Sequence, residues 1–277
     1  MIKINRSYVI DAFKKYISSY DLSDPKINLK IDHTYHVADM CDTISSSLSF
    51  DENYRDIAWF IGMMHDIGRF EQLRRYNTFL DRISLNHAAL SADILFNNKL
   101  ICNFLNISEK KLDNLKNNIS YDSKILNIIE KAVRFHNLKS LPNDMTDDEL
   151  LFANILRDAD KIDILRVCSI TPHSEIYDIP EDAFRTASYT IEVYEDAINC
   201  RDVDRSNSKT GIDFITGHIA FIYGIVFTES FRQIVKQGYL AKLMDFKSIN
   251  PDTIIKFENV CTIAKKYIFQ KCGEQIK

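Results

Sequence analysis

An apolar run that ends in a histidine and an aspartate limits the folds open to this chain. Residues 57–64 read Ile-Ala-Trp-Phe-Ile-Gly-Met-Met and are followed at once by His65 and Asp66. Such a run is typical of a buried helix, whose last turn then carries an imidazole beside a carboxylate. Two such groups are costly to bury unless something pairs with them. We therefore expect a divalent metal here, with the rest of the chain arranged around it.

The chain is poor in the residues that make turns. It has seven glycines and five prolines in 277 residues. Sandwich and Rossmann folds need many turns or glycine-rich phosphate loops, so we predict an almost wholly helical, all-α protein. Hydrophobic residues make up 45 % and charged residues 27 %, as in a globular protein. Since we find no internal repeat and no low-complexity linker, we predict one continuous helical domain over residues 1–277.

Net charge, the cysteine pattern and hydropathy limit the binding partners and the cellular location that we expect for the protein. The formal net charge of −4 gives no overall basic surface, so we do not expect non-specific nucleic-acid binding. The six cysteines form no CxxC pair and follow no signal-peptide pattern, so we expect free thiols and a cytoplasmic location. Segment 214–227 is apolar but shorter than the roughly 20 residues of a membrane span, which predicts a core helix and no membrane association.

Helical periodicity gives two histidines of the N-terminal region different positions. We expect a first helix over 3–20, ended by a turn at Pro25, and a second helix over 32–47. In the second helix His33 falls about 50° from the centre of the apolar face, whereas His36 falls about 110° away. His33 is therefore predicted to point inward and His36 toward the edge.

Two further histidines fall on apolar faces. A helix that begins at Ser84 places His87 on the same face as its leucine and isoleucine neighbours at i+3 and i+7. A helix over 125–135 then leads to His136, near the centre of its apolar stripe. We expect both imidazoles to be buried.

A long helix over 150–168 carries three aspartates close together. Periodicity favours Asp163 as the most buried of them and does not separate Asp158 from Asp160, so spacing alone leaves the liganding acid open. Further helices are expected over 181–200, 211–237, 239–247 and 251–271.

The inward histidines and aspartates together favour a transition metal. Imidazole with carboxylate suits iron, manganese, zinc, cobalt or nickel, whereas calcium and magnesium favour shells made of oxygen alone. Because no cysteine is near these positions, an open catalytic site is expected in place of a structural zinc site.

The ordered set resembles the HD-domain superfamily of metal-dependent phosphohydrolases. The similarity covers about residues 28–166 and rests on Asp-His33-Thr-Tyr-His-Val37, His65-Asp66-Ile-Gly and Asp-Ala-Asp160-Lys-Ile-Asp. It implies an HD-domain helical bundle with a C-terminal helical extension over about 167–277. It also assigns the last ligand to Asp160, the Asp of an Ala-Asp pair, and leaves Asp158 and Asp163 to orient ligands.

The resemblance implies one or two bound ions, with iron or manganese favoured over zinc, cobalt and nickel. Members with two additional histidines hold two metals, bridged by the aspartate of the His-Asp pair. The implied metal ligands are His33, His65, Asp66, His87, His136 and Asp160. Asn137-Leu-Lys stands where cyclic-di-GMP phosphodiesterases have Gly-Tyr-Pro, and Ile67-Gly68 stands where alarmone hydrolases have Glu-Asp, so neither branch is supported.

Hydrolysis of a phosphoester or phosphoanhydride is the implied activity. A metal lowers the pKa of its water from 15.7 toward about 7 and polarises a phosphoryl oxygen. Arg69 matches a family lysine that contacts substrate or bridging solvent, and a guanidinium there can bind phosphate through two hydrogen bonds. The expected catalytic residues are Asp66, Arg69 and Lys161, and the expected phosphate-binding residues are Arg69, Arg74 and Arg75.

The expected partner is a small phosphorylated molecule, with a nucleotide as the favoured class, and a dinucleoside polyphosphate is one option. Three aromatic residues could stack on its base: Tyr35, Tyr76 and Phe79. Two other functions stay open, a diiron oxygenase of the same fold and a nucleotide-sensing or scaffold protein with an inactive site. The amphipathic C-terminal helices would also allow a homodimer. We assign no metal-binding role to His36, His173 or His218.

Overall fold

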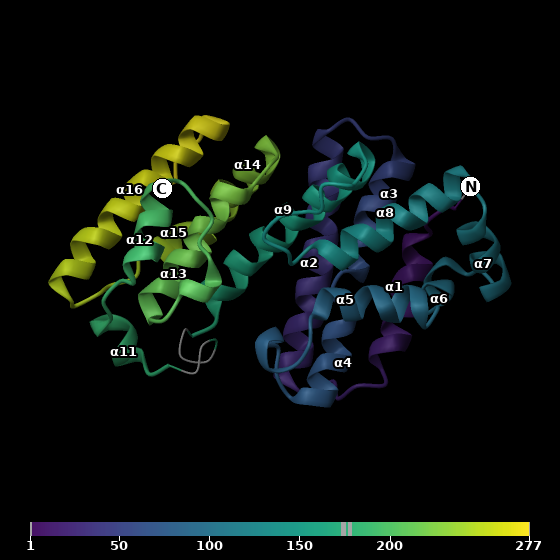
Figure 1. Ribbon diagram of the computed structural model, residues 1–277, viewed down its shortest axis with the longest axis horizontal. Helices are drawn as coiled ribbons and strands as arrows, with labels where there is room; N and C mark the ends of the chain where they lie inside the picture. The colour runs from purple at the N-terminus through teal and green to yellow at the C-terminus, as the bar shows by residue number, and fades with distance from the viewer. Residues whose placement is uncertain (1, 173–175, 177–178, 277) are drawn as a thin grey trace. The chain divides into compact units, whose positions relative to one another are not determined.

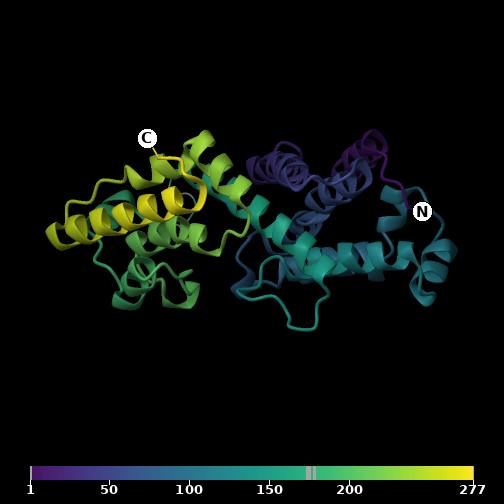
Figure 2. The same cartoon turned by 90° about the horizontal axis from the view of Figure 1, so that it is seen from above.

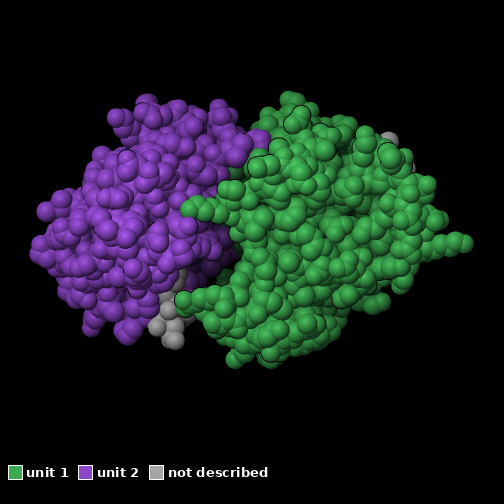
Figure 3. Space-filling model, in the orientation of Figure 1, with its two compact units in different colours: residues 1–160 green, residues 161–277 purple. Residues whose placement is uncertain are grey.

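Helices form the whole regular structure of the described chain. The computed structural model describes residues 2–172, 176 and 179–276, and 72 % of it is helical, with no strand among these residues. The predicted all-α class is confirmed. His173 lies outside the described residues. The chain divides into two compact units, residues 1–160 and residues 161–277, which Figure 3 colours separately. One continuous domain over the whole chain stays a prediction.

The first unit contains ten helical segments and the start of an eleventh (Figure 1). They are α1 (Arg6–Ile17), α2 (Pro25–Ser47), α3 (Glu52–Met64), α4 (Ile67–Tyr76), the 3-10 helix η1 (Asp81–Ile83), α5 (His87–Ala92), the π-helix η2 (Asp93–Asn97), α6 (Ile101–Leu105), α7 (Glu109–Asn117), α8 (Tyr121–Phe135) and α9 (Asp147–Ile170), whose C-terminal part belongs to the second unit. Helix α2 packs on α3, and α5 packs on both α4 and α8.

Helix α2 begins seven residues earlier than the sequence pattern indicated. The side chain of Asp24 accepts a hydrogen bond from the backbone N–H of Lys26, and Pro25 occupies the first helical position. Proline is favoured there because its missing N–H would have no partner in the first turn and its φ is already helical. Pro25 therefore starts the second helix, whereas we had expected it to end the first.

Helix α5 also differs from its predicted bounds. It starts at His87, three residues after the expected Ser84, because Asn86 accepts a hydrogen bond from the backbone N–H of Ala89 and caps the helix. At Asp93 the backbone widens into η2. The cap places His87 at the first position of the helix, beside the connection that precedes it.

The apolar run 57–64 forms the buried end of α3, and its helix does not continue unbroken through the His-Asp pair. All eight of these residues are buried. His65 ends α3 and Asp66 precedes α4, so the two side chains lie at a junction between helices. At its other end α4 stops at Asn77, which adopts the left-handed conformation with φ 53°.

Gly62 allows α2 and α3 to touch through their backbones. A Cβ atom at Gly62 would lie 2.6 Å from Ala38 Cα and 2.9 Å from Ala38 N. Backbone atoms in a helix cannot move aside as a flexible side chain would. Only glycine therefore permits this approach, which brings the middle of α2 to the C-terminal end of α3.

We predict that Gly62→Ala destabilises the protein. The added methyl group forces α2 and α3 apart, and overpacking of this kind costs about 1–3 kcal/mol. The free energy of unfolding from urea titration should fall by that amount relative to the wild type. Gly217→Ala is the matched control, because a Cβ there meets its nearest neighbour, Val203, only at 4.0 Å. Equal stability of Gly62→Ala and wild type would contradict the packing argument.

In the described part of the second unit, the helices are shorter than the sequence pattern indicated, except the last, which agrees with the helix expected over 251–271. They are α11 (Glu181–Thr186), α12 (Ile191–Ile198), the 3-10 helix η3 (Arg205–Asn207), α13 (Gly211–Ile219), the 3-10 helix η4 (Ala220–Gly224), α14 (Thr228–Gln237), α15 (Tyr239–Met244) and α16 (Pro251–Cys272). Helix α16 packs on α12 and α14 (Figures 1 and 2). A small core here joins Val193, Val203 and Ala220.

Two of the expected helices of this unit are interrupted. Segment 181–200 is two helices, because residues 187–190 are not helical. Segment 211–237 is also divided, because the chain tightens into η4 and becomes extended at Ile225, with φ −81° and ψ 136°. The side chain of Asp213 accepts hydrogen bonds from the backbone N–H and the hydroxyl of Thr190, which fixes the first interruption.

Two expectations from the sequence, one about the cysteines and one about membrane spans, can be compared with the structure. All six cysteines are free. Among the described residues, no helix combines the length and the apolar character that crossing a bilayer requires.

Candidate metal centre

The six predicted metal ligands converge in the first unit. They come from α2, the α3–α4 junction, the start of α5, the end of α8 and α9, and they form two groups in which ligand atoms lie within 4.8 Å of one another. The first group is His33, His65 and Asp160, and the second is Asp66, His87 and His136. All are buried except Asp160, which is nearly so. His36, by contrast, is exposed.

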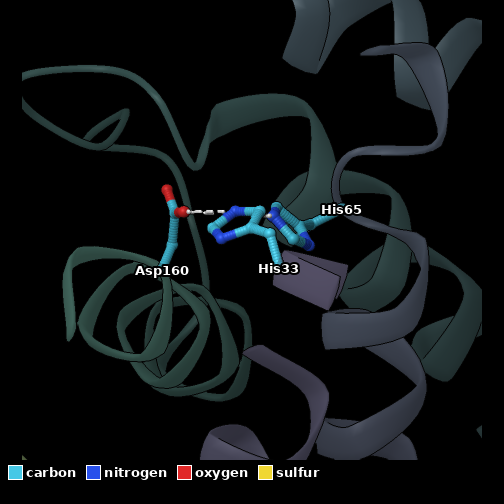
Figure 4. Close-up of side chains that lie close together, drawn as sticks. All are labelled: His33, His65 and Asp160. Atoms are coloured by element: carbon cyan, nitrogen blue, oxygen red, sulfur yellow. Dashed lines mark hydrogen bonds and ion pairs between the residues drawn. The ribbon is translucent and has the colours of Figure 1, made fainter. Parts of the chain in front are cut away.

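The first group joins α2, α3 and α9. His33 Nε2 lies 3.2 Å from His65 Nε2 and 3.2 Å from Asp160 Oδ1. Figure 4 shows the carboxylate of Asp160 facing the ring of His33, with the ring of His65 behind it. The three ligand atoms therefore face a common point from three helices.

The second group depends on close packing of α4 and α5. A Cβ atom at Gly68 would lie 2.7 Å from the backbone nitrogen of Ser91, so only glycine lets the two helices approach this closely. The approach brings His87 to within 3.6 Å of Asp66, measured from Nε2 to Oδ1. His87 Nε2 also lies 3.1 Å from His136 Nε2.

Hydrogen bonds fix which ring nitrogen carries the proton in three of the histidines. The Nδ1 atoms of His65 and His136 each lie 2.7 Å from a backbone carbonyl, of Gly62 and Val133 respectively. The Nδ1 atom of His87 lies 2.6 Å from Asp81 Oδ2. Carbonyl and carboxylate oxygens only accept, so Nδ1 donates in each case and Nε2 of the neutral ring carries the lone pair.

This tautomer leaves the Nε2 lone pairs of His65, His87 and His136 available to a metal. In the second group the two Nε2 atoms lie 3.1 Å apart, where their lone pairs repel unless a positive charge lies close to them, and Nη2 of Arg69 lies 3.2 Å from His87 Nε2. Asp66 Oδ1 is buried and has no hydrogen-bond partner among the described residues. A buried carboxylate oxygen without a partner is costly. The donors present therefore fit a divalent transition metal.

Asp66 lies between the two groups and turns one oxygen to each. Its Oδ2 is 3.6 Å from the Nε2 atoms of both His33 and His65. Its Oδ1 is 3.6 Å from Nε2 of His87 and 3.9 Å from Nε2 of His136. One carboxylate can therefore serve both groups, as the family resemblance implies for a binuclear site.

Electrostatics keep these side chains in their ligand forms. Burial lowers the pKa of His65, and it lowers the pKa values of His87 and His136 to about 4. Burial alone would raise the pKa of Asp66, but Lys30 and the neighbouring cationic and imidazole groups outweigh it, and the pKa lies well below its ordinary value. At neutral pH the imidazoles are neutral and the carboxylate is charged, which is what metal binding requires.

Two cations flank Asp66. Lys30, on α2, donates from Nζ to Asp66 Oδ2 at 2.7 Å. Arg69, on α4, lies with Nε 3.6 Å from Asp66 Oδ1, and this Nε has no hydrogen-bond partner among the described residues. Both cations lie over the ring of Phe79, with Lys30 Nζ 5.5 Å and Arg69 Cζ 5.7 Å from its centroid. Positive charge is therefore concentrated beside the two ligand groups.

Arg69 is also fixed by the connection between α4 and α5. Its Nη1 donates to Gln72 Oε1 at 2.8 Å, to the carbonyl of Phe79 at 2.7 Å and to Asp81 Oδ1 at 3.0 Å. Burial alone would raise the pKa of Asp81, but its hydrogen bond to His87 and the charge of Arg69 lower it to about 2. Asp81 is therefore charged at neutral pH.

Other predicted residues have partners elsewhere. Arg74 and Arg75 are more than half exposed, and both pair with Glu71. At 1.5 Å per residue, Arg74 lies about 12 Å along α4 from Asp66. Lys161 belongs to the second unit, where its Nζ pairs with Asp202 at 3.3 Å. The described partners of Arg74 and Arg75 lie outside both ligand groups. The predicted roles of all three cations stay predictions.

The three predicted stacking residues also separate. Only Phe79 contacts the cations beside Asp66. Tyr35 instead packs edge-on against Phe13, with the ring centroids 5.6 Å apart, and Tyr76 is exposed.

The aspartates of α9 correct one expectation. Asp158 is fully buried at 0 % exposure, whereas Asp163 is 4 % exposed, so Asp163 is not the most buried of the three. Asp163 instead pairs with Arg166, one turn further along the helix.

Sequence reasoning missed two residues at this centre. Lys30 stands three residues before His33, so it lies on the same helix face, and that spacing could have identified it. Asp81 lies in an irregular connection, where no periodic pattern signals its contact with His87.

Comparison with known families agrees with this geometry. A family model described as the HD domain matches residues 31–165, an interval that contains all six ligand-group residues. Comparisons with curated proteins and with solved structures found no match. Residues 31–165 of this chain therefore form an HD domain.

Proposed function

We propose that this protein is a metal-dependent phosphohydrolase that cleaves a phosphoester or phosphoanhydride of a small phosphorylated molecule, and that this molecule is a nucleotide. HD domains are generally of this class. The observation that carries the proposal is the position of Asp66, with one oxygen turned toward each histidine pair and a buried oxygen without a hydrogen-bond partner.

Each ligand group has its own residues, and they share one carboxylate. His33, His65 and Asp160 would hold one ion, and His87 and His136 a second, with Asp66 contributing to both. Ions held here supply Lewis-acid polarisation of a phosphoryl oxygen and a water molecule acidic enough to act as a nucleophile at neutral pH. The protein fixes the imidazole tautomers and keeps the donors in place, since every Nδ1–H described above is already bonded.

The cations beside Asp66 favour an anionic substrate. Lys30 has three N–H donors and uses one of them on Asp66, and the buried Arg69 Nε has no hydrogen-bond partner among the described residues. Both can therefore donate to a phosphate oxygen without losing a bond they already make. A guanidinium and an ammonium on one anion also stabilise the charge that develops in phosphoryl transfer.

Exposed apolar side chains lie next to this cationic region in the sequence and support a substrate with an apolar or aromatic part. Tyr76, Leu80 and Ile83 are each at least 45 % exposed, on the end of α4 and the connection that follows it. Phe79 lies between Tyr76 and Leu80 in the chain, and its ring faces both Lys30 and Arg69. A nucleotide, including a dinucleoside polyphosphate, combines a phosphate with an aromatic base in the required way.

A substrate panel tests the proposal. The protein, reconstituted with Mn²⁺ or Fe²⁺, is assayed for phosphate release from nucleoside mono-, di- and triphosphates and for cleavage of dinucleoside polyphosphates, with Asp66→Asn as the inactive control. Turnover that depends on the metal and is lost in Asp66→Asn supports the proposal. Oxygen consumption without phosphate release would instead identify an oxygenase, and nucleotide binding without turnover would identify a sensing protein.

Removal of metal should destabilise the protein. A ligand at 100 times its dissociation constant stabilises the folded state by about 2.7 kcal/mol, which for a chain of this size corresponds to a shift of roughly 5–10 °C. We therefore expect EDTA to lower Tm by about that amount in differential scanning fluorimetry, and added Mn²⁺ to restore it. An unchanged Tm after verified metal removal would argue against an occupied centre.

A further inference from the structure

One metal-site histidine is held differently from two of the others. His65 and His136 donate their Nδ1–H to carbonyls of their own helices, three residues earlier in the chain. His87 donates to the carboxylate of Asp81, which lies on the irregular connection between α4 and α5. A backbone carbonyl is fixed by its helix, whereas a carboxylate on a connection depends on the contacts that hold that connection.

Asp81 joins several groups around His87. Its Oδ2 accepts from His87 Nδ1 at 2.6 Å and from Asn137 Nδ2 at 3.2 Å. Its Oδ1 accepts from Arg69 Nη1 and from Gln72 Nε2, both at 3.0 Å. One carboxylate therefore contacts a ligand of the second group, the guanidinium beside Asp66 and the residue that follows His136.

Gln72 attaches this connection to α4. It is fully buried, and besides Asp81 its Nε2 donates to Ser84 Oγ at 2.8 Å and to the carbonyl of Leu85 at 3.2 Å. On the other side of the connection, Asn137 Nδ2 donates a second hydrogen bond, to Asn86 Oδ1 at 3.2 Å. These hydrogen bonds join the connection to Gln72 of α4 and to Asn137, which follows α8, and Asp81 accepts a bond from each of them.

We propose that Asp81 is the positioning residue for the second ligand group, holding His87 in its metal-binding tautomer and Arg69 in its orientation beside Asp66. The inference rests on the proposed function, since it assumes that both groups hold an ion. A charged acceptor behind a histidine ligand fixes the ring and raises its basicity. Nothing equivalent joins Asp81 to the first group, since none of its contacts in the described chain reaches His33, His65 or Asp160.

The proposal predicts that loss of the Asp81 charge affects one of the two metal ions and not the other. Loss of the carboxylate charge should weaken the ion at His87 and His136 and leave the ion at His33, His65 and Asp160 unchanged. Loss of a partner of this kind typically lowers metal affinity 10- to 100-fold. A general loss of stability would instead affect both ions together.

Titration of the metal-free protein with Co²⁺ tests this, with visible absorption and competition against a chelator as readouts. The wild type should bind two ions. In Asp81→Asn one ion should bind roughly 10- to 100-fold more weakly and the other within about twofold of the wild type. Asp81→Glu, which keeps the charge, should bind the weaker ion more tightly than Asp81→Asn.

Asp42→Asn is the matched control. Asp42 is also a carboxylate bonded to arginine, here Arg6 and Arg55, and its side chain is 22 % exposed against 30 % for Asp81. Its replacement should lower Tm and leave both Co²⁺ affinities unchanged. If Asp81→Asn does not fold, Asn137→Ala removes one donor to Asp81 and should weaken the same ion by about two- to tenfold.

The outcomes separate this inference from the proposed hydrolysis. Two ions with unchanged affinities in Asp81→Asn would overturn the role of Asp81 and leave the hydrolase proposal standing. Selective weakening of one ion, in a protein that releases no phosphate from any substrate tested, would support the role of Asp81 and count against the hydrolase. A wild type that binds fewer than two Co²⁺ ions would overturn the inference directly.

Discussion

Asp66→Asn is expected to abolish binding of both ions and to reduce hydrolysis by about 10³-fold or more. Each Asp66 oxygen faces a different histidine pair, at 3.6 Å in the closest contacts, so one substitution affects both groups. An amide presents a single, uncharged oxygen ligand. Loss of the ions removes several kcal/mol of charge stabilisation from the transition state, and each 1.36 kcal/mol is a factor of ten in rate.

Asp213→Asn is the control for this substitution. Asp213 is a fully buried carboxylate in the second unit that accepts hydrogen bonds from Thr190 and Thr210. Its replacement should lower the stability of the protein and leave the metal affinities unchanged. Chelator competition with Mn²⁺ measures the affinities in both variants. Retention of even one tightly bound ion in a folded Asp66→Asn protein would show that Asp66 does not serve both groups.

Lys30→Met should reduce kcat by about 10²- to 10³-fold and leave both ions bound. Loss of one donor aimed at developing negative charge typically has an effect of this size. Methionine keeps an unbranched apolar side chain of similar length, so the change is confined largely to the ammonium group, which lies over the ring of Phe79. Asp66 also loses a cation that competes for its Oδ2, so metal affinity should not fall.

Steady-state kinetics and metal content measured together test the role of Lys30. The control is Lys26→Met, one turn earlier on α2, where the side chain is exposed. Lys26→Met should match the wild type in both measurements. A Lys30→Met protein that loses metal, or that keeps full activity, would contradict a role for Lys30 in contacting phosphate.

Local sequence patterns were sufficient to predict the burial of several side chains at this centre. His33 and His87 share faces with apolar neighbours, so helical periodicity alone predicts their burial, which the structure confirms. The helical class follows from the scarcity of glycine and proline. The choice of Asp160 needed the family motif, because all three aspartates of α9 lie close to the core and periodicity ranked them wrongly.

Some of the remaining features depend on contacts between segments that are far apart in the sequence, and others on local choices that the sequence pattern leaves open. Asp81 meets His87 and Asn137 only because α4, α5 and α8 pack together. A proline read as a helix end can equally begin one, and only the cap made by Asp24 decides for Pro25. The pairing of Arg74 and Arg75 with Glu71, in contrast, is local and follows the i,i+3 and i,i+4 spacing of a helix, so it could have been predicted from the sequence.

Metal content per chain is the most direct test of a two-ion centre. Protein purified without chelators, or reconstituted with manganese or iron and then desalted, is measured by elemental analysis against protein concentration. The arrangement of two histidine pairs around one carboxylate predicts two transition-metal ions per chain. A folded wild-type protein that holds no ion after reconstitution would contradict the centre, and with it the proposed hydrolysis.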